Sequence, residues 1–194
     1  MAKAGKENRK DHIQEAAQRL FRENGYSATS MRDLANEVGI EAASLYSHIE
    51  SKEEILRTIC FEMADQFFDG LASVEDAGLP EDKKLELAIA SHIEVIALNR
   101  SASAVFFHDS RHLGEPYHSD FKLMRRRYEN YFKKIIERGI EQKIFRCVDS
   151  TFTVRTLFSA MNWTYAWHGS GKNDTPEIIT KKITSLILEG LSKK

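Results

Sequence analysis

The chain has 194 residues, of which 42% are hydrophobic and 29% charged, and its formal net charge is -1 at pH 7. This composition excludes a disordered or collagen-like chain and is that of an ordinary globular protein. No apolar run approaches the roughly 20 residues of a membrane-spanning helix, and no apolar stretch follows the basic N-terminus, so neither a membrane partner nor a secretory signal is expected. Two cysteines, Cys60 and Cys147, are too few for a disulfide framework and favour a reducing, cytoplasmic setting.

The scarcity of helix-breaking residues predicts an all-α fold of about nine helices, because only 3 prolines and 10 glycines interrupt the chain. Apolar residues at i, i+3, i+4 and i+7 predict an amphipathic helix over 11–24, ended by Gly25. Two short helices are expected over 31–38 and 42–48, joined by a turn at Gly39 that needs a positive φ. Short helices joined by such a turn are typical of a helix-turn-helix.

Six further helices are expected. Ser51 and Glu54 form the pattern of a capping box and open a fourth helix, which runs without a flexible linker to the break at Gly78. Thr175 as N-cap and Pro176 at the first helical position start the last helix. The helices between these two are predicted over 81–98, 101–111, 117–143 and 149–167.

The segment from Thr29 to Leu56 reads TSMRDLANEVGIEAASLYSHIESKEEIL. It resembles the DNA-binding signature of the tetracycline-repressor (TetR) family, which has a Thr/Ser-x-Arg-Asp-Ile-Ala start, a Val-Gly turn and a Leu-Tyr-x-His-Phe-x-Ser-Lys-Glu-Glu-Leu ending. Phe21, Gly25 and Tyr26 also fit the Leu-Phe-x-x-x-Gly-Tyr pattern that precedes this signature in the family.

The resemblance implies a helix-turn-helix DNA-binding domain at 1–52 and a helical ligand-binding and dimerisation domain at 53–194. It implies a repressor, not an enzyme, that binds double-stranded operator DNA as a homodimer and is released by a small-molecule effector, without a cofactor. Ile49 replaces the family's usual Phe, and Glu41 and Glu50 flank the third helix where neutral or basic residues are commoner. A carboxylate near phosphate is repulsive, so these departures bear on affinity and not on fold.

The expected DNA contacts lie on the second and third helices and at the start of the fourth. Small and polar side chains can enter the major groove, and alanine can touch the methyl group of thymine. Hydroxyl and ammonium groups, and the free N–H groups at a helix start, attract phosphate. The predicted DNA-binding residues are Thr29, Ser30, Arg32, Ala42, Ala43, Ser44, Tyr46, Ser47, His48 and Lys52.

The last two predicted helices are too apolar to face water on every side. A two-fold four-helix interface between two subunits is expected there, because the two half-sites of an operator are bound by two helix-turn-helix domains. Ordinary packing within one chain is the alternative. The apolar residues concerned are Phe152, Phe158, Met161, Ile179, Ile183, Leu186 and Ile187.

The middle helices interleave aromatic and polar residues. An apolar cavity with a few polar anchors is typical of a small-molecule site, although core packing explains each residue taken alone. The predicted ligand-binding residues are His92, Phe106, Phe107, His108, Phe121, Met124, Arg125, Tyr128, Phe132, Asn162, Trp163 and Trp167.

The stretches FRCVD, MNWTYAWH and RRRYE resemble the C-terminal half of TetR regulators that control lipid and sterol catabolism, several of which respond to acyl-CoA. An aromatic and methionine cavity suits an acyl chain. Arg125 or Arg127 at its mouth suits the phosphates of the carrier. The expected effector is therefore an acyl thioester of coenzyme A.

Two other hypotheses rest on His108, His112 and His118. The first two lie four residues apart, superficially like the His-Glu-x-x-His pattern of zinc hydrolases, with Asp109 in place of Glu. A metal-sensing regulator is the first alternative. A metal-dependent helical hydrolase is the second alternative, and it is disfavoured because the most specific motif in the chain is a DNA-binding motif.

Overall fold

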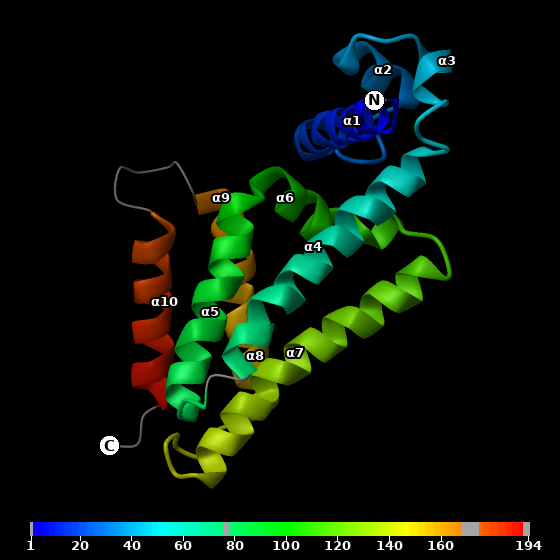
Figure 1. Ribbon diagram of the computed structural model, residues 1–194. Coiled ribbons are helices and arrows are strands. Elements are labelled where there is room, and N and C mark those ends of the chain that lie inside the picture. The colour runs from blue at the N-terminus through cyan, green and yellow to red at the C-terminus, as the bar shows by residue number, and fades with distance from the viewer. Residues whose placement is uncertain (1, 76–77, 168–174, 192–194) are drawn as a thin grey trace. The chain divides into compact units, whose positions relative to one another are not determined.

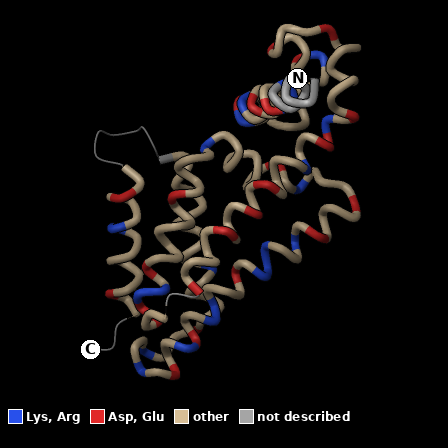
Figure 2. Tube along the Cα trace, in the orientation of Figure 1, with Lys and Arg blue, Asp and Glu red and all other residues tan. Residues whose placement is uncertain are grey.

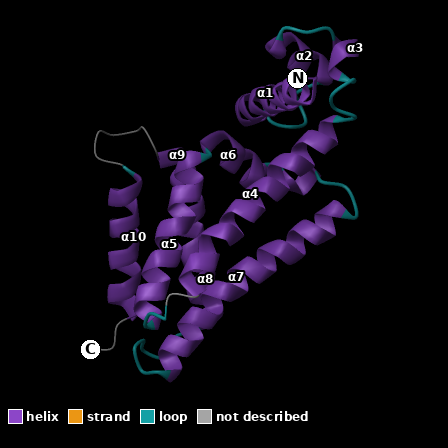
Figure 3. Ribbon diagram, viewed as in Figure 1, coloured by secondary structure: helices purple, strands orange, loops and turns teal. Residues whose placement is uncertain are grey.

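The computed structural model describes residues 2–75, 78–167 and 175–191, and the side chains of residues 2–8 and of Trp167 lie outside the described part. Within these ranges the regular structure is helical throughout, without a strand (Figure 3), so the all-α prediction is confirmed. The elements are α1 (Ala2–Asn24), α2 (Met31–Val38), α3 (Ala42–Leu45), α4 (Lys52–Glu75), α5 (Glu81–Leu98), α6 (Arg100–His108), a 3₁₀ turn η1 (Ser110–His112), α7 (Tyr117–Glu141), α8 (Ser150–Asn162), α9 (Thr164–Trp167) and α10 (Pro176–Leu191) (Figure 1).

The chain divides into two compact units. The first comprises Met1–Met63 and Ser101–Lys122, and the second comprises Ala64–Arg100 and Leu123–Lys194. Helices α4 and α7 therefore contribute residues to both units. These units are defined by packing, so the functional boundary expected after residue 52 stays a prediction. Among the described helices, each is too short or too polar to cross a membrane.

The ends of α2 follow from its sequence. The Ser30 hydroxyl accepts a hydrogen bond from the Asp33 N–H at 3.2 Å, and the Asp33 carboxylate accepts one from the Ser30 N–H at 2.8 Å, which completes a capping box. Gly39 ends the helix with a φ of 71°, in the left-handed region that glycine adopts without strain. Leu34 and Leu45 are fully buried and hold α2 and α3 in the core of the first unit.

Helix α3 is shorter than predicted. It ends at Leu45 and not at His48, because the next N–H groups donate to carbonyl groups three residues back, as in a turn: Ser47 to Ser44 at 3.1 Å and His48 to Leu45 at 3.0 Å. The four-residue helix is thus anchored by a single fully buried side chain, that of Leu45.

The start of α4 also differs in detail from the prediction. The Ser51 hydroxyl accepts a hydrogen bond from the Glu54 N–H at 3.1 Å, as expected for an N-cap. The Glu54 carboxylate, however, accepts from the N–H of Glu50 at 2.6 Å. The cap therefore reaches one residue further back than a regular capping box does.

Helix α5 is the centre of the second unit. It contacts α8, α9 and α10 (Figure 1), and its buried face carries Leu85, Ile89, Ile93 and Ile96 at helical spacing. Burying each of these side chains stabilises the fold by about 1.5–3 kcal/mol. The helix predicted over 149–167 is interrupted at Trp163, which divides it into α8 and α9.

Candidate DNA-binding and effector sites

The predicted base-reading residues form an exposed surface around α3. Ala43, Ser44 and Ser47 are exposed and Ala42 is half-buried, as is the adjacent His48, which is predicted to contact phosphate. The Ser47 hydroxyl donates to the Ser44 carbonyl at 2.7 Å, and its oxygen lone pairs remain free to accept from a base amino group. A short helix that presents small side chains can approach base edges closely.

The predicted phosphate contacts divide into exposed and internally bonded groups. Arg32 is exposed, and 55% of the surface of Tyr46 is exposed. Thr29 is buried and its hydroxyl donates to the Gly25 carbonyl at 2.9 Å, while the Ser30 hydroxyl lies within the α2 cap. The role observed for Thr29 and Ser30 is structural, and their contact with phosphate stays a prediction.

Lys52 occupies the first position of α4, where free backbone N–H groups attract anions. Its ammonium group donates to the carbonyl oxygens of Tyr26 at 2.8 Å and of Thr29 at 2.7 Å, and lies 4.3 Å from the centre of the Tyr26 ring. An ammonium group has three N–H donors. One donor is therefore left for a phosphate oxygen after the two carbonyl groups are satisfied.

The second unit holds a buried polar group in an aromatic shell. The Nδ1 atom of His92 lies 3.1 Å from the hydroxyl of Tyr128, and its Nε2 atom lies 3.1 Å from Oδ1 of Asn162. An amide oxygen only accepts, so Nε2 carries the ring proton and Nδ1 accepts from the Tyr128 hydroxyl. The ring of Phe67 stacks on His92 at 4.6 Å, and Phe158 meets it edge-on at 5.4 Å.

Burial decides the protonation of this group. Desolvation lowers the pKa of His92 to about 3, although the hydrogen bond with Asn162 opposes the shift, so the imidazole is neutral. Burial also raises the pKa of the Tyr128 hydroxyl, which stays protonated and can donate. The Asn162 amide N–H groups and the Tyr128 oxygen are the remaining donors and acceptor of the network.

The other predicted ligand residues occupy varied positions. Phe132 is buried beside Tyr128 at 5.5 Å, Met124 is half-buried, and Arg125 is exposed on α7 and paired with Glu129 at 3.5 Å. In the first unit Phe106 meets both Phe107 and Phe121 edge-on, at 5.1 and 5.0 Å, and His108 is exposed. Trp163 is 54% exposed. The side chain of Trp167 lies outside the described residues.

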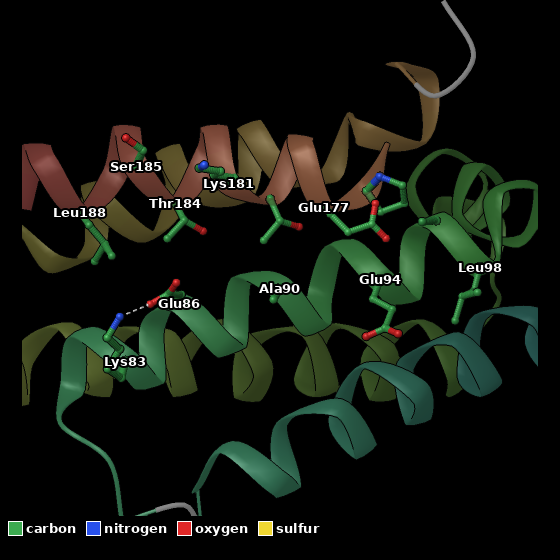
Figure 4. A pocket seen from close by; sticks show the side chains of 13 residues that line it. Lys83, Glu86, Ala90, Glu94, Leu98, Glu177, Lys181, Thr184, Ser185 and Leu188 are labelled. Carbon is green, nitrogen blue, oxygen red and sulfur yellow. Dashed lines mark hydrogen bonds and ion pairs between the residues drawn. The ribbon is translucent and has the colours of Figure 1, made fainter. Parts of the chain in front are cut away.

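A groove of about 810 Å³ runs between α5 and α10 (Figure 4) and was not predicted from the sequence. Small side chains line much of it, among them Ala90, Ala97, Thr180 and Thr184. The Thr184 hydroxyl is buried without a hydrogen-bond partner in the described part of the chain. Small residues recur along both helices in the sequence, and this pattern could have indicated a groove. The pattern alone does not reveal which two helices pack together.

The apolar residues of α8 and α10 differ in exposure, and Phe158 and Ile187 are half-buried. Phe152 and Leu186 are 69% and 73% exposed, and both line a second groove, of about 360 Å³, between these helices. Met161, Ile179 and Ile183 are instead buried within their own chain. Packing within one chain, the alternative left open by the sequence, therefore accounts for these three, which complete the core around α5.

The histidines considered for a metal site have other surroundings. The ring of His112 stacks on Tyr26 at 5.4 Å, and His118 lies 4.0 Å from the carboxylate of Glu115. Among the described side chains, no group of three or more His, Cys, Asp and Glu residues is arranged to hold a metal ion. The metal-sensing alternative gains no support from this geometry.

The exposed α3, the capped α2 and the helical second unit define a DNA-binding protein of the helix-turn-helix class. The family model of the bacterial regulatory proteins of the tetR family matches residues 13–59, and that of the tetracyclin repressor-like C-terminal domain matches residues 78–191. The chain belongs to the TetR family of transcriptional regulators. It is accordingly a regulator and not an enzyme.

Several proteins resemble the chain over nearly its whole length. The transcriptional repressor KstR2 of Rhodococcus jostii is 27% identical, over 97% of this chain and 94% of its own. The ketosteroid transcriptional regulator KstR2 of Mycobacterium tuberculosis has a similar structure, with a TM-score of 0.90 at 23% identity over 96% of both chains. AibR, solved with isovaleryl coenzyme A and operator DNA, gives a TM-score of 0.82 at 24% identity, over 92% of this chain and 97% of its own.

Proposed function

We propose that this regulator represses transcription as a cytoplasmic homodimer and is released from its operator by an acyl thioester of coenzyme A. The observation that carries the choice of effector is the buried network of His92, Tyr128 and Asn162 in its aromatic shell. Two groups of this network keep hydrogen-bonding capacity, namely the amide of Asn162 and the oxygen of Tyr128. Only the Asn162 amide still has N–H groups to donate, and a donor in apolar surroundings suits the carbonyl group of an otherwise apolar acyl chain.

Two of the related proteins bear on the choice of effector, and one of them bound a coenzyme A ester. One is named as a ketosteroid regulator, and another was solved with isovaleryl coenzyme A together with operator DNA. The carrier half of such a ligand is anionic. Lys and Arg recur along α7 (Figure 2), where Arg125 and Arg127 are exposed and can bind phosphate oxygens.

Dimerisation places two α3 surfaces on one pseudo-palindromic operator. The exposed Phe152, Trp163 and Leu186 supply an apolar face that a second subunit would cover. The effector acts by binding the released conformation more tightly than the DNA-bound one, since only a difference in affinity can shift that equilibrium.

The test compares coenzyme A esters with their free acids. Thermal shift and operator release are measured for the natural protein, for Asn162→Ala, and for Ser159→Ala, a control on an exposed position of α8. Esters are expected to stabilise the natural protein and the control, and to act only weakly on Asn162→Ala. A response to free acids alone would show that Arg125 and Arg127 do not bind the phosphates of a carrier. No response to any ester would overturn the proposal.

A further inference from the structure

The turn that follows α6 contacts the turn between α1 and α2. The buried carboxylate of Asp109 accepts from the backbone N–H of Tyr26 at 3.4 Å. The His112 ring stacks on the Tyr26 ring, with centroids 5.4 Å apart and planes 26° apart. The Ser27 hydroxyl lies 3.5 Å from Nε2 of His112. Each contact is weak alone, but together they hold Tyr26 by its backbone and by its ring.

His112 also contacts the side chain of the preceding residue, Arg111. The guanidinium Nε of Arg111 lies 3.4 Å from Nε2 of His112, and a guanidinium group can only donate. The His112 Nε2 atom must therefore accept, and the Ser27 hydroxyl is a donor to the same atom.

Tyr26 in turn holds Lys52. The Lys52 ammonium donates to the Tyr26 carbonyl at 2.8 Å and lies 4.3 Å from the centre of its ring. The next residue, Glu53, accepts at 2.8 Å from the N–H of Gly114, which follows η1. The turn that holds Tyr26 and the segment from His112 to Gly114 therefore contact each other directly, and each also contacts the start of α4. The first turn of α4 is held at two adjacent residues, Lys52 and Glu53.

We propose that Asp109 and His112 are positioning residues for DNA binding, which act by orienting the Lys52 ammonium toward a phosphate. The inference rests on the proposed function of Lys52 as a phosphate contact. The Tyr26 carbonyl accepts one of the three ammonium N–H groups, and the Thr29 carbonyl, at the other end of the same turn, accepts a second. The third N–H keeps a defined direction only while Tyr26 is held in place.

This arrangement gives the segment after α6 a direct influence on the DNA-binding residues. Asp109 lies 83 positions from Tyr26 in the sequence, within the segment expected to belong to the effector domain. A displacement of η1 would remove the stack on Tyr26 and the hydrogen bond to Glu53 together. Lys52 would then lose its orientation without any change in the α3 surface.

The test uses the salt dependence of operator affinity, which counts phosphate contacts. Removing one phosphate contact reduces the slope of log K against log salt concentration by about 0.9 per subunit. Lys52→Ala is expected to show this reduction. His112→Ala is expected to show it too, with an affinity loss of about threefold to tenfold at one salt concentration, the size of one hydrogen bond. The double variant should bind no more weakly than Lys52→Ala.

Matched variants separate positioning from general stability. His112→Phe keeps an aromatic ring against Tyr26 and should retain most of the affinity and the natural slope. Asp109→Asn keeps an acceptor for the Tyr26 N–H and should behave similarly, whereas Asp109→Ala should resemble His112→Ala. The inference would be overturned if His112→Ala lost affinity while the slope of its salt dependence stayed unchanged. It would also be overturned if the affinity losses of His112→Ala and Lys52→Ala added fully in the double variant. An unchanged slope in Lys52→Ala would instead refute the phosphate contact on which it rests.

Discussion

The buried imidazole of His92 should make the free energy of unfolding depend on pH. Its pKa is about 3 in the folded protein, against the ordinary histidine value of 6.5 that applies to the unfolded chain. Between these values the unfolded state binds the additional proton, so stability is full above pH 6.5 and is lost progressively as the pH falls. Each unit of pKa difference corresponds to about 1.36 kcal/mol, so at pH 5 the loss relative to pH 7 is about 2 kcal/mol.

The assay is urea unfolding followed by circular dichroism at pH 7 and pH 5, at one protein concentration. The control is His92→Gln, because glutamine can donate to Asn162 and accept from Tyr128 but does not titrate in this range. Carboxylates contribute equally to both proteins, so the natural protein should lose about 2 kcal/mol more than the variant between the two pH values. Equal losses would refute the reasoning that desolvation keeps the His92 imidazole neutral.

Three further predictions concern assembly, packing and coupling. Leu186→Glu, at an exposed position, should give folded monomers in sedimentation, whereas Ile183→Glu should lose several kcal/mol of stability in chemical unfolding, because it buries a charge within the chain. Gly139→Ala should lower the melting temperature, because its Cβ would lie 2.3 Å from the ring of Phe145 and overpacking costs about 1–3 kcal/mol. Inserting two glycines near Ala64 in α4 should leave effector binding intact but abolish operator release, as measured by calorimetry and fluorescence anisotropy; full induction would contradict a coupling route through this helix.

Local signals in the sequence predicted where most helices begin and end, because caps and turns depend on near neighbours, but α1 begins at Ala2 and not at the predicted Asp11. Ser30 caps the start of α2 and Gly39 caps its end, as expected from their residue types. The same local reasoning did not reveal that Thr29 is buried, since a threonine beside a helix start can serve a turn or a phosphate equally well. Its hydroxyl is committed to Gly25, an interaction visible only once the backbone between α1 and α2 is folded.

Long-range packing accounts for what the sequence could not predict. Ile183 and Leu186 are both aliphatic and lie three residues apart on α10, yet one is 7% exposed and the other 73% exposed, because α5 covers only one side of the helix. Helical periodicity identifies an apolar stripe but not its neighbour. The contact of His112 with Tyr26 is likewise non-local and joins segments that carry no matching pattern.

The anchoring of α3 by Leu45 alone has a consequence for how this regulator can diversify. Ala43, Ser44 and Ser47 face solvent, and surface substitutions of this kind usually change stability by less than about 0.5 kcal/mol. Operator preference can thus drift under selection while the folded state stays above the stability threshold that purges most mutations. The same separation allows a laboratory library randomised at these three codons to be screened for new operators with little loss of folded clones.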